Sequence, residues 1–206
     1  MKIFVIALVA GLVPVLARPA VAHDLFSSIY APAGYTQDLE MRVSHGCKGS
    51  PLKEVKIKIP EGIVRVTVEY VRDWHVELKM RKFDKPVPWE GGRMLTEVVD
   101  EIIWKDPPSP MPGSLMYEGF HFRVLLPDTP GAILFFRTVN VCEKGDDRYV
   151  DLPTEPLTAA TPGLAQKLGK FMTATPTPSP FIILEKPSHP EYPWVVPTEA
   201  KHPSGK

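Results

Sequence analysis

The most informative residue for chemistry is a histidine, His23, which directly follows a segment with the features of a secretory signal. Lys2 supplies a positive charge, residues 3–16 are almost wholly apolar, and residues 20–22 (Ala-Val-Ala) form the small-x-small pattern of a signal-peptidase site. We therefore expect residues 1–22 to be a cleaved signal peptide. Cleavage after Ala22 would make His23 the first residue of an exported, periplasmic or secreted protein.

A histidine at a chain terminus offers two nitrogen atoms from one residue, the freed α-amine and the imidazole Nδ1. The pKa of an α-amine is about 7.7–8.0, so its deprotonation at neutral pH costs only about 1 kcal/mol. Cu(II) stands highest in the affinity order of the divalent first-row metals and prefers tetragonal nitrogen and oxygen donors. The chemistry predicted at His23 is therefore binding of Cu²⁺.

Two donors do not complete a copper site, and the best further candidate is His45. It lies at the end of a predicted strand over 39–43, and pairing of that strand with the segment after His23 would bring the two histidines together. Gln37 and Glu40 are nearby oxygen donors. The alternatives are that His45 forms an ordinary hydrogen bond at a strand end and that Glu40 is solvated on a polar strand face.

Other histidines and methionines give weaker signals. His75 and His121 lie within strand patterns, where hydrogen-bonded or exposed histidines are more common than ligands. Three methionines, Met94, Met111 and Met116, carry thioether groups of the soft type that suits Cu(I). They do not form a tight motif and are better explained as gap-filling residues.

Cys47 and Cys142 are the only cysteines. In an oxidising compartment we expect them to form one disulfide, which would close a loop of about 95 residues and contribute about 4–5 kcal/mol in the chain-entropy model. The alternative is a pair of thiolate metal ligands, but no other residues of matching chemistry lie beside them in the sequence.

The elements that must position these residues are strands. From residue 37 to 152, apolar and polar residues alternate with a period of two, which is typical of strands with one buried face. Glycine and proline pairs separate the alternating segments. The predicted strands are 39–43, 55–59, 64–70, 74–81, 98–104, 117–126, 132–142 and 148–152.

About eight short strands at near-regular spacing predict an all-β fold, a β-sandwich, over residues 23–153. Residues 154–206 are rich in proline, so we expect a mostly loose tail. One short helix is predicted there, with Thr161 as its N-cap, Pro162 in its first position, and an apolar face of Leu164, Leu168 and Phe171.

The composition excludes several classes of protein. Basic and acidic side chains number 24 each, so no basic surplus is available to neutralise nucleic-acid phosphates. The 24 prolines exclude a mainly helical fold. The apolar run near the start is shorter than the ~20 residues that a membrane span needs, so we expect no span after signal cleavage; an uncleaved anchor is the alternative.

The chain also resembles a known family through an ordered set of segments. After the terminal histidine come APAGYTQDLEMRVSHGCKG, VKIKIPEGI, DWHVEL, EIIW, YEGFHFRV and LFFRTVNVCEKGDDRYVDLP. These resemble the YcnI-like copper-binding family, long catalogued as an exported domain of unknown function, in a form with a His-Gly-Cys motif. The resemblance implies an immunoglobulin- or fibronectin-like β-sandwich and Cu(II) held by the amine and imidazole of His23.

In that family a glutamate and a tryptophan complete the site, and this chain departs from the pattern at both places. Residues 44–47 read Ser-His-Gly-Cys where the glutamate is expected, so we take His45 as the substitute ligand. Tyr149 stands where the tryptophan is expected and is taken as a metal-proximal residue. The resemblance further implies a role in copper homeostasis as a chaperone, sensor or store, with a copper-import membrane protein or a copper chaperone as partner.

Two other functions remain open. A copper oxidase or polysaccharide oxygenase also uses a terminal histidine, but it needs a second coplanar histidine, for which His45, His75 and His121 are candidates. A metal-free interaction module would use the sandwich as a scaffold and the proline-rich tail for docking. We expect copper handling rather than catalysis.

Overall fold

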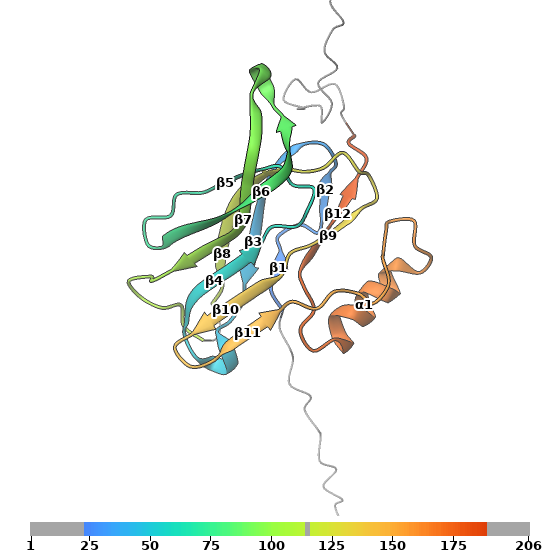
Figure 1. Cartoon of the computed structure of the whole chain (residues 1–206). Coiled ribbons are helices and arrows are strands. Elements are labelled where there is room, and N and C mark those ends of the chain that lie inside the picture. Colours follow the sequence, from blue (N-terminus) through green and yellow to red (C-terminus); the bar gives the residue numbers. More distant parts are fainter. Residues whose placement is uncertain (1–22, 114–115, 189–206) are drawn as a thin grey trace, which may run out of the picture.

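The computed structural model describes residues 23–113 and 116–188. The predicted signal peptide and the two histidines of the tail, His189 and His202, lie outside the described residues. Within them the chain forms strands, one α-helix and two short 3-10 helices (Figure 1). The elements are β1 (Leu25–Phe26), β2 (Tyr30–Pro32), β3 (Thr36–Val43), η1 (Cys47–Gly49), β4 (Leu52–Lys58), β5 (Arg65–Val68), β6 (His75–Pro88), η2 (Glu90–Gly92), β7 (Met94–Lys105), β8 (Glu118–Leu125), β9 (Ile133–Phe135), β10 (Thr138–Cys142), β11 (Asp146–Tyr149), α1 (Leu164–Ala174) and β12 (Phe181–Glu185).

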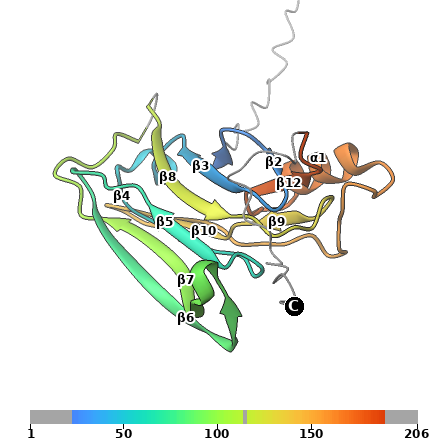
Figure 2. The same ribbon diagram turned by 90° about the horizontal axis from the view of Figure 1, so that it is seen from above.

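The strands form three sheets. One has the order β1-β3-β8-β5, the second has the order β11-β10-β4-β7-β6, and a small third sheet has the order β2-β12-β9. All strand pairs are antiparallel except β12 with β2. Figure 2 shows the β6–β7 hairpin extending to one side and α1 lying on the opposite side. The predicted all-β sandwich is confirmed.

The core lies between the two larger sheets, where the inward residues of each strand meet. Met41 of β3, Ile57 of β4 and Phe120 of β8 are almost completely buried. Trp104 is also buried, and its ring centroid lies 5.2 Å from that of Phe120. The period-two pattern predicts that these large side chains are buried. Their burial is the main favourable contribution to the stability of the fold.

The predicted strand over 132–142 is divided between two sheets, so this prediction is wrong in its continuity. β9 pairs with β12, whereas β10 pairs with β4 and β11. Phe136, between the two strands, donates its backbone N–H to Pro180. The alternation in the sequence does not reveal this change of partner, because every second residue remains buried from β9 through to β10. These residues are Leu134, Phe136, Thr138, Asn140 and Cys142.

The prediction of a mostly loose tail is wrong for residues 154–188. β12 lies between β2 and β9, and Ile182 and Leu184 join the main core. The predicted short helix exists as α1, but its N-cap is Gly163 rather than Thr161. Residues 154–188 are ordered because their apolar segments bury against the sandwich, an effect that proline content does not reveal.

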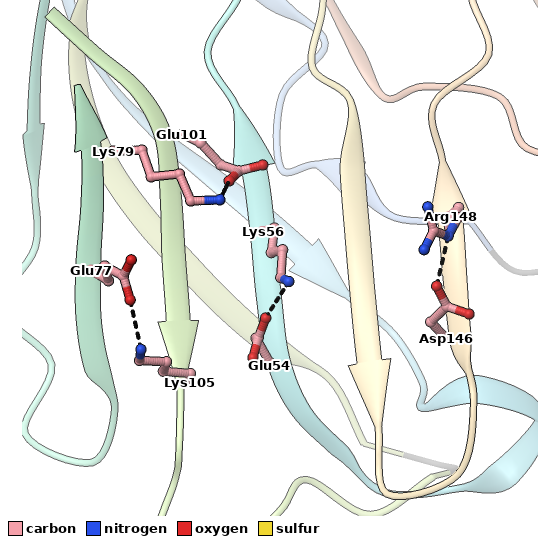
Figure 3. A network of polar contacts seen from close by, with 8 residues as sticks. All are labelled: Glu54, Lys56, Glu77, Lys79, Glu101, Lys105, Asp146 and Arg148. Atoms are coloured by element: carbon pink, nitrogen blue, oxygen red, sulfur yellow. Dashed lines mark hydrogen bonds and ion pairs between the residues drawn. The ribbon is translucent and has the colours of Figure 1, made fainter. Parts of the chain in front are cut away.

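The outward face of the five-stranded sheet carries alternating charges. Four ion pairs cross it, each with an N–O distance of 2.6 Å (Figure 3). They are Glu54–Lys56, Lys79–Glu101, Glu77–Lys105 and Asp146–Arg148. Exposed pairs of this kind contribute little to stability, typically about 0–1 kcal/mol.

Candidate metal centre

Strand pairing brings the two candidate histidines to one end of the sandwich. β1 pairs with β3 in antiparallel register, Leu25 opposite Arg42, so the chain before β1 runs beside the chain after β3. His23 stands two residues before β1, and His45 stands two residues after β3. The conditional expectation that these segments pair is confirmed, and His45 is close enough to lower the pKa of His23 electrostatically.

The disulfide holds the loop that carries His45. Cys47 in η1 is bonded to Cys142 at the end of β10, with their Cα atoms 5.9 Å apart. The Cys47 N–H also lies 2.8 Å from the Cys142 Sγ. The predicted disulfide is confirmed, and it fastens the segment between β3 and β4 to the second sheet.

Gly46, between His45 and Cys47, is required by close packing. A Cβ atom added there would lie 1.8 Å from the Ser50 carbonyl oxygen and 3.3 Å from the Gly113 Cα. His45 Nδ1 lies 2.8 Å from the Gly46 carbonyl oxygen. Since a carbonyl can only accept, Nδ1 carries a proton and donates this hydrogen bond.

His23 has the electronic state that a metal ligand needs. Burial, followed by the nearby charge of His45, lowers its pKa from the usual value, although a hydrogen bond to the Met172 backbone opposes the shift. The imidazole is therefore neutral at pH 7. Its Nδ1 is buried and has no hydrogen-bond partner. Buried polar atoms are nearly always hydrogen-bonded, so this atom lacks a partner that the site would be expected to supply.

Tyr149 of β11 lies beside this imidazole. The two ring centroids are 5.8 Å apart and the rings meet edge to face. Ser179 donates its hydroxyl to the Tyr149 carbonyl at 3.2 Å, which ties β11 to the segment before β12. Burial and the nearby charges of Asp24 and Asp147 raise the pKa of the Tyr149 phenol, so it stays protonated at physiological pH.

A buried carboxyl group, Asp24, follows His23 in the chain. Only 1% of Asp24 is exposed, and Asn140 Nδ2 donates to its Oδ2 at 2.8 Å. Burial raises the Asp24 pKa to about 7 despite the opposing effects of Asn140 and His45. Asn140 Oδ1 is also buried without a partner. The site therefore combines an orphaned imidazole nitrogen with a buried carboxyl group whose pKa is raised by its burial.

The residues at this site offer nitrogen donors of the type that Cu(II) prefers. Within residues 23–113 and 116–188 no group of three or more His, Cys, Asp and Glu side chains is placed to hold a metal ion. The nitrogen donors that fit copper are His23 Nδ1, the His45 imidazole, and the α-amine that cleavage after Ala22 would create. Among these donors, His23 Nδ1 gives the structural indication of a metal, because it is buried and has no hydrogen-bond partner.

The other candidate residues lie elsewhere. Gln37 and Glu40 are on β3 before the end that approaches His23; Gln37 donates to Thr36, and Glu40 pairs with Arg42 at 2.9 Å. His121 is on the outward face of β8, 4.0 Å from Glu69, beside a hollow of about 440 Å³. His75 is exposed at the start of β6. Met111 is buried in the core, whereas Met94 and Met116 are exposed.

Sequence reasoning missed two groups at this site: the Asp24 carboxyl and the Asn140 side chain. Asn140 could have been noticed, because it is a polar residue in the inward series of a predicted strand. Asp24 is adjacent to His23, but its burial depends on the opposite sheet.

The profile of a family described as a domain of unknown function, DUF1775, matches residues 23–167. No match was found among curated proteins. Two solved structures match the chain. An uncharacterized protein from Nocardia farcinica with an immunoglobulin-like fold superposes with a TM-score of 0.55 at 14% identity, over 80% of this chain and 99% of the other. The seventh ScaB type I cohesin from Pseudobacteroides cellulosolvens gives 0.33 at 9% identity, over 82% and 95%.

The first of these likenesses supports an immunoglobulin-like sandwich and, at this identity, nothing about chemistry. Among residues 23–113 and 116–188, no helix has the length and apolar character that a membrane span requires.

Proposed function

Since the chain belongs to the DUF1775 family, whose function is undefined, we propose that it is an exported Cu(II)-binding protein of copper homeostasis. It binds the metal through the α-amine and imidazole of its mature N-terminal residue, His23, with His45 as a further ligand. It handles copper as a chaperone, sensor or store rather than catalysing a reaction. Its compartment is the periplasm or the exterior, and its partner is a copper-import membrane protein or a copper chaperone.

The observation that carries this proposal is the state of His23 Nδ1. That atom is buried and has no hydrogen-bond partner, and the ring is neutral because burial lowers its pKa. Nδ1 is also the ring nitrogen that forms a chelate with the α-amine of the same residue. A bound metal would supply the missing partner and use the lone pair that the fold leaves unpaired.

Two neighbouring groups support a cation at this place. The Asp24 carboxyl is buried beside His23, and burial of an uncompensated negative charge is costly unless a positive charge lies nearby. The Gly46 carbonyl accepts a hydrogen bond from His45 Nδ1 and so orients this ring. A hydrogen bond to the second ring nitrogen is the usual support of a metal-binding histidine.

The test compares two forms of the protein, one that begins at His23 and one with a single glycine before it. The extension removes the chelate because the α-amine no longer belongs to the histidine. We expect tight Cu(II) binding by calorimetry and a type 2 spectrum by electron paramagnetic resonance for the first form, and at least tenfold weaker binding for the second. Equal affinity in the two forms would contradict the proposal.

A copper oxidase remains the second candidate, because the pairing of β1 with β3 brings His45 toward His23. The copper-loaded protein that begins at His23 should be incubated with ascorbate and oxygen, and hydrogen peroxide measured. We expect no production above that of the glycine-extended form. Turnover that depends on both His23 and His45 would replace copper handling with oxidation.

A further inference from the structure

The segment that carries His23 enters the fold through a short strand. β1 has two residues and lies at the edge of its sheet, where it pairs only with β3. Phe26 is its buried anchor, with its ring centroid 4.8 Å from that of Phe136. Terminal segments are poorly ordered unless something ties them to the body of the protein. In the proposed mature chain, a fixed position for His23 therefore needs a second anchor close to it.

Asp24 supplies this anchor. Asp24 and Phe26 are 1% and 5% exposed, whereas Leu25 between them is 47% exposed, so the alternation of a strand directs the first two side chains inward. Asn140 Nδ2 donates to Asp24 Oδ2 at 2.8 Å. Asn140 is 1% exposed and lies in β10, which belongs to the five-stranded sheet. The hydrogen bond therefore ties the residue next to His23 to the opposite sheet of the sandwich.

Asn140 also contacts the segment that carries His45. The Cys47 Sγ lies 3.4 Å from the Asn140 carbonyl oxygen. Cys47 stands two residues after His45 in the chain. Its disulfide partner, Cys142, stands two residues after Asn140 in β10. Asn140 thus contacts both segments that carry the proposed nitrogen ligands, one through its side chain and the other through its backbone.

The Asn140 side chain has a cost that packing alone does not explain. Its Oδ1 is buried and has no hydrogen-bond partner among the described residues. Such an atom costs about 1–3 kcal/mol, which an apolar side chain of similar shape would avoid. In some proteins a buried polar pair is retained because it selects one arrangement of two segments. The Asp24–Asn140 pair joins two segments in this way.

We propose that Asn140 is a positioning residue of the metal site. Its amide fixes Asp24, and through the peptide chain it fixes the amine and imidazole of His23 relative to the loop that carries His45. Asn140 acts through Asp24 and is not itself a ligand. The proposal deepens the proposed function and rests on it for its purpose, but the position of His23 can be measured without any metal.

The first experiment measures the position of His23 by NMR in the metal-free protein that begins at this residue. The ring centroids of His23 and Tyr149 lie 5.8 Å apart, close enough for nuclear Overhauser effects between ring protons. Asn140→Leu keeps a side chain of similar shape but removes the donor to Asp24. We expect the ring-to-ring effects in the wild type and their loss in Asn140→Leu. Their absence from the wild type, or their full persistence in a folded Asn140→Leu, would overturn the proposal.

The exchanged pair, Asp24→Asn combined with Asn140→Asp, separates the hydrogen bond from the identity of each residue. It keeps one carboxyl group and one amide and reverses the direction of the bond, so position 24 becomes the donor. We expect the contact between His23 and Tyr149 to return in this double variant. If Asn140→Leu does not fold, the exchanged pair decides alone. Loss of the contact from a folded exchanged pair would contradict the proposal.

Thr138→Val is the matched control for a general weakening of β10. Thr138 is also buried in this strand, and its hydroxyl donates to the Phe136 carbonyl at 3.2 Å. The substitution removes a buried hydrogen bond of the same strand and keeps the donor to Asp24. We expect the contact of His23 with Tyr149 to be retained. Its loss in Thr138→Val would mean that any damage to β10 displaces His23, and the specific role of Asn140 would be refuted.

Copper affinity gives an independent measurement on the same variants. Loss of an outer-shell partner typically weakens metal binding about 10–100-fold. We expect such a loss of Cu(II) affinity for Asn140→Leu by calorimetry, with a changed electron paramagnetic resonance spectrum, and recovery of both in the exchanged pair. An unchanged affinity and spectrum in Asn140→Leu would overturn the proposal. If no form binds Cu(II), the proposed function fails, and the contact of His23 with Tyr149 still decides whether Asn140 positions His23.

Discussion

At the scale of single residues, the site is built from groups whose polarity conflicts with their burial. His23 Nδ1 and Asn140 Oδ1 are buried without partners, and Asp24 is a buried carboxyl group. Each arrangement reduces the stability of the metal-free protein, since burial of unsatisfied polar atoms costs about 1–3 kcal/mol per group. Their concentration around one histidine is expected of a binding site and not of a purely structural strand end.

Asp24 predicts a specific pH dependence of stability in the metal-free protein. Its pKa is about 7 in the fold, against about 3.9 in an unfolded chain. Between these values the folded protein binds the additional proton, so the free energy of unfolding falls as the pH rises from about 4 to about 7. The full effect is on the order of 4 kcal/mol, and it is complete above pH 7.

Asp24→Asn removes this titration. The new amide keeps an oxygen for Asn140 Nδ2 and adds an N–H for the unpartnered Asn140 Oδ1. Compared with the wild type, the variant should be similar at pH 4 and more stable by a few kcal/mol at pH 8. Denaturant unfolding in the presence of a chelator measures the difference. A gap between the two proteins that does not change with pH would show that Asp24 ionises normally.

At the scale of elements, the disulfide and the close packing of the His-Gly-Cys segment together position His45, the proposed second histidine ligand. The disulfide fixes Cys47 to β10, and the lack of a side chain on Gly46 lets the backbone approach Ser50 and Gly113. His45 is then oriented by its hydrogen bond to the next residue.

Gly46→Ala tests this loop. The added methyl group would overlap the Ser50 carbonyl oxygen, so the loop must move. We expect a loss of stability of about 1–3 kcal/mol, the usual cost of overpacking, together with weaker copper binding. Gly169→Ala is the matched control, because it should slightly stabilise α1. Unchanged unfolding and copper affinity in Gly46→Ala would mean that the loop tolerates displacement and does not position His45.

At the scale of the whole molecule, the C-terminal segment is part of the sandwich. β12 lies between β2, near the start of the described chain, and β9, and its Ile182 belongs to the main core. Ile182→Ala should therefore destabilise the entire domain by about 2–5 kcal/mol. Tryptophan fluorescence, which reports on the buried Trp74 and Trp104, and far-ultraviolet circular dichroism should shift together.

Leu168→Ala provides the contrast. This residue belongs to the separate cluster under α1, so its truncation should loosen the helix with a smaller effect on the tryptophan signal. If Ile182→Ala left the tryptophan midpoint unchanged while Leu168→Ala lowered it, the division into a main core and a helix core would be wrong.

The sequence by itself determined the sandwich and the disulfide, and it supplied the proposed first ligand, His23, because each follows from a pattern in the sequence. Alternation with a period of two records which side of a strand is buried, two cysteines have only one way to pair, and a cleavage pattern ends at one residue. The possible approach of His45 to His23 also followed, since pairing of neighbouring strands sets it.

Only the tertiary structure decided the burial of Asp24 beside Asn140 and the change of sheet between β9 and β10. The first joins residues more than 100 positions apart, and the second depends on which neighbour a strand selects. An alternating pattern is the same whichever sheet receives the strand. The packing of the last 30 or so described residues onto the sandwich therefore supplied what the pattern could not.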